Sequence, residues 1–449
     1  MVFWLVILCS FAKGQGAFTN AVETFDAAWR IIEETHYDRD FNGVDWKKVR
    51  DELRPRAERA RTKPELDAII QDMLNRLGQS HMDLLPQQPS TNRKGKPRRD
   101  AVRKEDPARE SGSAGIDARF LDGRWVVTRV DNESPASRAG VHPGWIISRL
   151  SGMNADDFAP VRDGKTEGAS YVEAWSEVNH LLKGEVGSKV SLSFIKSSNE
   201  SVALDLNRQR PLGEAAKLGN LPTFFAEFES NVIPSATGRK LGYIRFNIWM
   251  MPIAYKFSQA MERLRGVEGI IIDLRGNVGG VAGLVMGISG HFLEDPLSLG
   301  TMKTREGELQ FRSNPRKVNL AGERVTPFAG PVAILVDQIS LSASEIFAGG
   351  MQAIGRAHIF GEQTGGMALP ASFDQLPNGD LLVHALGDFI TPTGVRLEGR
   401  GVVPDEKVAA KRDDLLAGRD APLLAAMAWI SQESGKRTRV KVAAERSGK

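Results

Sequence analysis

The stretch PVAILVDQISLSASEIFAGGMQ (residues 331–352) combines the pattern of a buried strand with that of a helix. Its first part, VAILV at 332–336, is a continuous apolar run rich in β-branched residues, which is typical of a strand buried on both faces. Further along, apolar residues return at helical spacing, and Ser340, Ser342 and Ser344 lie at the junction. We therefore predict a strand, a tight turn and a helix, which is a unit of an α/β fold.

A serine at such a junction has a possible chemical role. Free backbone N–H groups lie beside it and the positive end of a helix dipole lies behind it, and this setting stabilises an oxyanion if the serine attacks a carbonyl. The run Ser342-Ala343-Ser344-Glu345 is equally a capping box, in which the serine only ends the helix. The junction alone leaves both interpretations open.

The composition describes a soluble globular protein of several domains. The chain has 449 residues, of which 41% are hydrophobic and 26% charged, so two or three domains are expected. A net charge of +3 is weak for this length and argues against a nucleic-acid partner. A single cysteine excludes a disulfide framework within the chain and any cysteine-based zinc cluster.

The first residues, MVFWLVILCSFAKGQG, are almost wholly apolar from 2 to 12, a length too short to span a bilayer. Ala12 and Gly14 provide small residues for a cleavage site, so we predict an export signal at 1–14 and a periplasmic or extracellular location. No integral membrane segment is expected after cleavage. The alternative is a frayed apolar end on a cytosolic protein.

Two helices are predicted next. Apolar residues recur on one helical face over 22–32, and a second helix begins with Thr62 and Glu65 in capping-box spacing and ends at Gly78. Ser80 and His81 follow this helix stop on a loop. Residues 90–112 carry many charges of both signs and no aromatic residues, so we interpret them as a solvated linker rather than a nucleic-acid patch.

After the linker the pattern changes to short strands bounded by glycines, of which RWVVTRV at 124–130 is the clearest. They surround a short alanine-rich helix, and the motifs SPA at 134–136, AGV at 139–141 and PG at 143–144 accompany it. This region resembles a bacterial PDZ domain. Such domains add a peptide strand to a sheet edge, which implies a peptide-binding site at Gly115 and Ile116. A PDZ-shaped spacer with a blocked groove is the alternative.

A second strand-to-helix turn follows. GIIIDL at 269–274 is predicted as a buried strand that leads into RGNVGG at 275–280 and an apolar helical run from 281 to 292. Glycines at such a turn let backbone amides approach a ligand closely. Neither G-x-G-x-x-G nor a P-loop lysine is present, so a further source of N–H groups for an oxyanion fits better than nucleotide binding.

Together these segments resemble the S41 serine peptidases, which comprise the C-terminal processing and tricorn-core proteases. The resemblance is carried by these motifs, in order: FDAAWRIIEETHYD, DW, LGQSH, the PDZ-like region, IIDLRGNVGG, SLSASEIFAGGMQAIGRA and LEGRGVVPD. It implies a multidomain α/β protein with an N-terminal helical region, an inserted β-rich PDZ domain and a crotonase-like α/β peptidase core. The expected boundaries are signal 1–14, helical region 15–89, linker 90–112, PDZ domain 113–210, core 211–431 and polar, disordered tail 432–449.

The resemblance assigns the nucleophile to Ser342 and the oxyanion N–H groups to Ala343 and to Gly279 or Gly280. The processing branch uses a Ser/Lys dyad, but Met367 stands at the matching lysine position. Methionine cannot accept a proton, so a Ser/Lys mechanism requires a lysine from elsewhere. The acidic position that this branch often has further along the serine helix is also missing, because Ala353 stands there.

The tricorn-like branch instead uses a histidine preceded by a serine, together with a glutamate, and Ser80, His81 and Glu398 occupy those places. His81 would take the proton from Ser342, while Glu398, directly or through Ser80, would orient the imidazole. His358 and His384 remain alternative bases.

The expected activity is hydrolysis of protein or peptide substrates through an acyl-enzyme, without a metal or organic cofactor. One alternative is a non-catalytic protein that binds a peptide or hydrophobic ligand on the same scaffold. Another is an esterase or lipase, although the G-x-S-x-G elbow is absent around Ser342.

Overall fold

The structure is a computed structural model that describes residues 20–85, 111–162, 164–219, 221, 223–235 and 238–447, with side chains described as far as residue 436. The expected signal at 1–14 and nearly all of the expected linker lie outside these residues. The chain forms two compact units, one of residues 1–99 with 371–387 and one of residues 100–370 with 388–449.

The first unit is helical, with a small antiparallel sheet. Its elements are α1 (Ala21–Thr35), η1 (Phe41–Gly43), α2 (Trp46–Arg59), α3 (Lys63–Asn75), β1 (Asp83–Leu85), β19 (Ala371–Gln375) and β20 (Leu381–Ala385). Both predicted helices form, and Thr62 caps α3 by accepting from the Glu65 N–H. Trp29 and Trp46 each donate an indole N–H to the other's carbonyl, which ties α1 to α2.

The part of the second unit that precedes residue 210 is an antiparallel sheet with strand order β3-β4-β5-β8-β9. Its elements are β2 (Ser111–Ser113), β3 (Ile116–Leu121), β4 (Arg124–Val130), α4 (Pro135–Arg138), β5 (Ile146–Leu150), β6 (Met153–Asn154), η3 (Ala155–Phe158), α5 (Glu167–Leu182), β7 (Lys183–Glu185), β8 (Lys189–Ile195) and β9 (Ser201–Asn207). The predicted strand at 124–130 is β4, and the predicted short helix is α4. Trp125, Val127 and Phe194 are fully buried beneath α5 in the centre of this layer.

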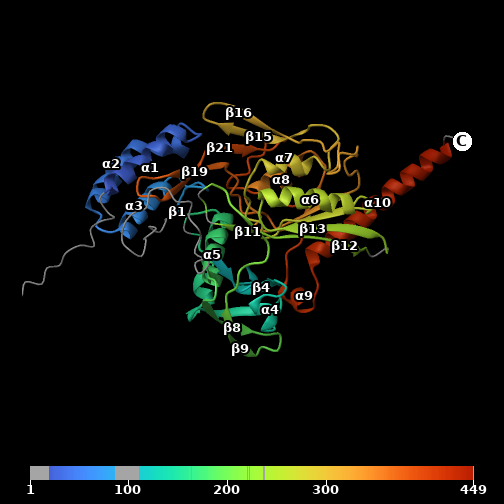
Figure 1. Cartoon of the computed structure of the whole chain (residues 1–449), viewed down its shortest axis with the longest axis horizontal. Helices are drawn as coiled ribbons and strands as arrows, with labels where there is room; N and C mark the ends of the chain where they lie inside the picture. The colour runs from blue at the N-terminus through green and yellow to red at the C-terminus, as the bar shows by residue number, and fades with distance from the viewer. Residues whose placement is uncertain are drawn as a thin grey trace, which may run out of the picture. The chain divides into compact units, whose positions relative to one another are not determined.

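The rest of the second unit is built on a sheet with strand order β12-β13-β14-β17-β18-β22, in which only β12 runs antiparallel to its neighbour. Figure 1 labels two of its strands, β12 and β13, below α6. The strands are β12 (Phe228–Pro234), β13 (Lys240–Phe246), β14 (Ile270–Asp273), β17 (Val332–Val336), β18 (His358–Gly361) and β22 (Glu406–Lys407). Helices α6 (Met251–Arg263), α7 (Leu284–Ser289) and α8 (Ala343–Ala353) pack on one face, and α10 (Ala421–Ser447) packs on the other.

Alternate residues of the central strands face opposite layers, as the period of a strand requires. Ile272 and Ile334 pack toward α6 and α8, whereas Ile271 and Leu335 pack toward α10. Because both faces are covered, the strands read as continuous apolar runs, which is why the sequence pattern predicted them.

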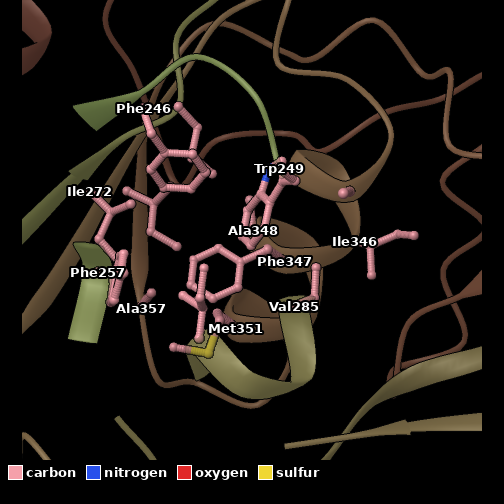
Figure 2. Packing of buried hydrophobic residues seen from close by; sticks show 14 of the residues in the cluster. Phe246, Trp249, Phe257, Ile272, Val285, Ile346, Phe347, Ala348, Met351 and Ala357 are labelled. Carbon is pink, nitrogen blue, oxygen red and sulfur yellow. The ribbon is translucent and has the colours of Figure 1, made fainter. Parts of the chain in front are cut away.

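Aromatic side chains hold α8 against the end of β13. The centroid of the Trp249 ring lies 4.9 Å from that of Phe246, in an edge-to-face arrangement, and 5.3 Å from that of Phe347, in a tilted one; Figure 2 labels the three residues in this cluster. The indole N–H of Trp249 donates to the hydroxyl of Ser344 at 2.9 Å. The start of α8 is therefore fixed by packing and by a buried hydrogen bond.

Strand β20 pairs with β19 across the loop 376–380, in which the N–H of Leu376 donates to the carbonyl of Asp380, whereas β21 (Gly387–Ile390) belongs to another sheet. Two local expectations are wrong. The run 281–292 contains only the short α7, since glycines interrupt it. Residues 432–447 continue α10 rather than forming a disordered tail, because lysine, arginine, alanine and glutamate favour helix.

The remaining elements of this unit are β10 (Glu214–Ala216), β11 (Phe224–Ala226), β15 (Ser298–Thr304), β16 (Glu308–Arg312) and α9 (Arg412–Leu416). The strands β16, β15 and β21 form a further sheet, whose strand β15 contacts α8.

Candidate active site

Ser342 lies at the turn between β17 and α8, in an unusual backbone conformation. Its φ is 52° and its ψ is −116° at the N-cap of the helix. Positive φ values are uncommon outside glycine and cost of order 1–3 kcal/mol, and such strain is found most often at functional sites. A serine held in this conformation is therefore a candidate for chemistry rather than an ordinary cap.

The two neighbouring serines have structural roles. Ser340 and Ser344 are fully buried. The Ser340 hydroxyl donates to the carbonyl of Leu274 at 2.8 Å, and that of Ser344 donates to the carbonyl of Asn277 at 3.1 Å. Among the three serines, only Ser342 has solvent-accessible surface.

The glycine-rich turn after β14 packs directly against Ser342. A Cβ atom at Gly279 would lie 2.6 Å from the Cβ of Ser342 and 2.8 Å from the carbonyl oxygen of Leu341, so any side chain there would collide with the serine turn. Gly279 and Gly280 also have φ values of 91° and 136°, which favour glycine. The turn between 275 and 280 is therefore built for close approach to the serine.

Asn277 connects this turn to its surroundings. Its side-chain N–H donates to the carbonyl of Phe246 at 2.9 Å, its Oδ1 accepts from the N–H of Gly279 at 3.0 Å, and its own carbonyl accepts from the N–H of Leu341. The Gly279 N–H is thus already used. Within the described residues, the N–H groups of Gly280 and Ala343 have no recorded acceptor, and Ala343 is the first residue of α8, where no acceptor within the helix is available.

Glu345 joins the serine turn to the loop that contains Met367. One of its carboxylate oxygens accepts from the N–H groups of Ser342 and Met367, each at 3.0 Å, and the other accepts from Gly366 and from the Thr364 hydroxyl. The predicted capping interaction of Glu345 is thus present, within a larger network. Complete burial raises the pKa of Glu345 to about 7 in spite of these four donors.

Met367 and Glu398 lie in the same neighbourhood. The Met367 carbonyl accepts from the Ser342 N–H at 3.0 Å, which places the position that would hold a lysine beside the serine. Glu398 is 9% exposed, and its Oε2 accepts from the N–H of Ala368 at 2.9 Å. Glu398 is therefore nearly buried rather than a surface charge, although Arg396 and Arg400 flank it in the sequence.

Ser80 and His81 belong to the first unit. The Ser80 hydroxyl lies 2.8 Å from Nδ1 of His81, and His81 has a φ of 56°. Burial lowers the pKa of His81 to about 4, so the imidazole is neutral at neutral pH and needs a nearby negative charge to stabilise its protonated form. Gln79, the residue before this pair, is bound to Nε2 of His36 at 2.9 Å and to the Tyr37 hydroxyl, which fixes the turn after α3.

The two alternative histidines have other partners. Nε2 of His384 lies 2.7 Å from an oxygen of Asp374 and its Nδ1 lies 3.1 Å from the Thr35 hydroxyl, in the buried centre of the first unit. His358 stacks on Trp429 at the amino end of β18, whereas Ser342 follows the carboxyl end of the neighbouring parallel strand. Neither arrangement resembles a catalytic base beside a nucleophile.

Asp337 and Arg119 form a buried link that the sequence analysis missed. Oδ1 of Asp337 accepts from the N–H groups of Gly276 at 2.9 Å and Ile339 at 3.0 Å, so one carboxylate holds both strand-to-helix turns. Its Oδ2 accepts from Nε of Arg119 on β3 at 2.8 Å. Charged residues this deeply buried are normally paired, which is a signal that burial reveals and sequence does not.

The expected peptide-binding position lies at the start of β3, which is an edge strand of its sheet. Gly115 has a φ of 75° and its N–H donates to the Ser113 hydroxyl, while Ile116 pairs with Val130. Along the same strand, the N–H of Phe120 donates to the hydroxyl of Tyr171 on α5 at 3.0 Å. A peptide that extended this sheet at Phe120 would have to replace that bond.

Two searches of the described residues gave negative results. In that part of the chain, no group of three or more histidine, cysteine, aspartate or glutamate side chains is arranged to hold a metal ion. Nor does any helix among these residues combine the length and apolar character needed to cross a bilayer.

A serine with positive φ at a strand-to-helix turn, on an α/β scaffold, is an arrangement compatible with a serine hydrolase. The comparisons with known proteins specify the family. Residues 240–408 match the model of peptidase family S41, and residues 20–75 match that of the tricorn protease C1 domain. The chain is 25% identical over 397 residues to the carboxyl-terminal-processing protease of Picosynechococcus sp., covering 87% of this chain and 84% of that protein.

Solved structures show the same fold. The photosystem II D1 C-terminal processing protease matches with a TM-score of 0.56 and 23% identity, covering 90% of this chain and 99% of that chain. The tricorn protease matches with a TM-score of 0.51 and 16% identity, covering 92% of this chain and 37% of that chain. Residues 240–408 belong to peptidase family S41, and the chain is a serine-type peptidase.

Proposed function

We propose that this protein is a serine endopeptidase that cleaves protein or peptide substrates through an acyl-enzyme at Ser342, with His81 as the general base and Glu398 as its orienting carboxylate. The observation that carries the proposal is the conformation of Ser342, whose positive φ is maintained by Glu345, Met367 and the glycine-rich turn. Strain maintained by this many contacts is expected where a nucleophile must be presented to a substrate.

The oxyanion of the tetrahedral intermediate would be held by the N–H groups of Ala343 and Gly280. The alternative donor, Gly279, is less suitable because its N–H already donates to Asn277 at 3.0 Å. The role of Gly279 is steric instead: because it has no side chain, the glycine-rich turn can lie close to Ser342. Fixed N–H donors of this kind stabilise developing negative charge without reorganisation, and each contributes about 3–4 kcal/mol to catalysis.

The assignment of the base rests on chemistry and on the resemblance to the tricorn-like branch. His81 is neutral at neutral pH, and its Nδ1 is engaged by Ser80, which leaves Nε2 for proton transfer when Nδ1 carries the proton. Met367 cannot serve, since a thioether does not accept a proton at neutral pH. Glu398 is anchored by Ala368, next to Met367, and its charge would stabilise the imidazolium that forms during catalysis.

Two architectural assignments belong to the same proposal. The sheet β3-β4-β5-β8-β9 with α5 fits a PDZ domain, and Gly115 and Ile116 begin the edge strand that would bind a peptide. The sheet from β12 to β22, with helices on both faces, fits a crotonase-like core. The apolar N-terminal run of the sequence supports export to the periplasm or beyond.

The test is digestion of an unfolded protein such as casein by the full chain and by Ser342→Ala, His81→Ala and Met367→Ala, with folding verified by circular dichroism. The proposal predicts activity in the wild type and in Met367→Ala and losses of at least about 10³-fold in the other two. Activity that survives in His81→Ala would leave Ser342 as nucleophile and refute the choice of base. Folded but inactive wild type would favour the non-catalytic binding protein.

A further inference from the structure

A cavity of about 430 Å³ lies at the end of the core sheet opposite to Ser342. It is bordered by the ends of α6 and α7 and by the segment 325–330, which leads into β17, whereas Ser342 follows the other end of that strand. Apolar side chains from Met261, Val267 and Val325 contribute to its wall. The cavity is therefore separate from the candidate active site.

The ionisable side chains that line this cavity are all basic. They are Arg265, His291 and Arg316, and no aspartate or glutamate lines it in the described part of the chain. Within the described residues, neither arginine has a recorded ion pair or side-chain hydrogen bond, and Nε of Arg316 is buried without an acceptor. Arg265 is exposed and Arg316 is half-buried, so water reaches both guanidinium groups, but the buried Nε of Arg316 is a donor that an anion in the cavity would satisfy.

Two other arginines of the same unit have hydrogen-bond acceptors for their guanidinium groups. Arg275 is bound to Asp273 and Asp420, and Arg356, at the neighbouring loop, donates to the carbonyls of Phe292 and Phe328. These two arginines have carboxylate or carbonyl acceptors, whereas the two that line the cavity have none among the described residues.

The histidine completes the set of donors. A ring nitrogen of His291 lies 3.2 Å from the hydroxyl of Ser258, and the ring stands beside the cavity. Burial, with added repulsion from Arg316 and Arg265, lowers the pKa of His291 to about 4. An anion between these three side chains would oppose that repulsion and raise the pKa of His291.

We propose that this cavity binds a small organic oxyanion, a phosphate or carboxylate carried on an apolar body, through Arg265, Arg316 and His291. Guanidinium groups match both oxyanions with paired hydrogen bonds, and the apolar wall suits a ring or short alkyl group. A cavity of about 150 Å³ holds benzene, so the present volume admits a ring together with its anionic group. The end of α6 contributes only about half a negative charge, less than the two guanidinium groups.

The test uses the full chain with phenyl phosphate, benzoate and inorganic phosphate as separate probes in isothermal titration calorimetry. Saturable binding of phenyl phosphate or benzoate with a Kd below about 1 mM, and at least tenfold weaker binding of inorganic phosphate, would support the proposal. Preference between the first two distinguishes a phosphate source from a carboxylate source. No saturable binding of any probe up to about 10 mM would overturn it.

Substitutions of the arginines that line the cavity test whether the probes bind there. Arg316→Gln and Arg265→Gln should each weaken binding by at least tenfold, whereas Arg312→Gln, an exposed arginine outside the cavity, should not. Arg265 is exposed, so its variant is expected to fold even if that of Arg316 is not. Nuclear magnetic resonance titration of the histidines should show the pKa of His291 rising when the probe is bound. Equal binding by Arg265→Gln and wild type, or an unchanged pKa of His291, would refute the site.

Discussion

Substitution of Gly279 gives the most specific structural prediction, because any side chain at this position would collide with the serine turn. Replacing it with alanine adds a Cβ 2.6 Å from that of Ser342, about 1 Å inside normal carbon–carbon contact. The nearest atoms on the other sides are backbone atoms of Leu341 and Ala343, which cannot rotate away. The serine turn must therefore shift by roughly the same 1 Å.

A displacement of about 1 Å at a reacting group reduces rate by about 100-fold, so Gly279→Ala should lower kcat for casein or a peptide substrate by at least that factor. The positive φ of 91° adds about 1–3 kcal/mol of destabilisation. The matched control is Gly355→Ala at the other end of α8, where φ is 69° and nothing lies within 4 Å of the added Cβ. Equal kcat for Gly279→Ala and wild type, or an equal loss in Gly355→Ala, would refute the steric argument.

Three further predictions concern stability, each measured by urea unfolding. Ser344→Ala leaves the buried indole N–H of Trp249 without its acceptor and should cost about 1–3 kcal/mol. Arg119→Met leaves Asp337 buried without its cation and should cost about 3–5 kcal/mol. Because burial raises the pKa of Glu345 from 4.5 to about 7, its contribution to the unfolding free energy is fully present below pH 4.5 and is lost as the pH rises through 7. Glu345→Gln should remove that part of the pH dependence between pH 5 and 8, and an unchanged slope would contradict the assignment.

The fold could be predicted where burial leaves a local pattern. The strand at 332–336 and the helix after it follow from an apolar run and a change of period, because β17 is covered on both faces. The pairing of β1 with β20 could not be predicted, since strands about 300 residues apart leave no local signal of their partner. The Asn378-Gly379 dipeptide, by contrast, is a local signal for the hairpin of β19 and β20.

Some residues of the candidate site could be predicted from local sequence patterns and others could not. Ser342 and the glycine-rich turn follow predicted strands, where functional residues of α/β proteins are expected, whereas His81 and Glu398 were assigned only through the resemblance to a family. Asp337 could not be predicted as a network residue, and Glu345 could be predicted only as a helix cap, because a carboxylate in a sequence does not show how many N–H groups it accepts from. Burial and hydrogen-bond partners, which only coordinates supply, distinguish them from surface charges.

The most direct test of the central claim is covalent labelling with a fluorophosphonate probe, followed by mass spectrometry of the tryptic peptides. The proposal predicts a single phosphonyl adduct on Ser342 in the wild type and in Met367→Ala, and a labelling rate at least about 100-fold lower in folded His81→Ala. An adduct that forms equally fast in His81→Ala, or that maps to another serine while Ser342 remains unmodified, would contradict it.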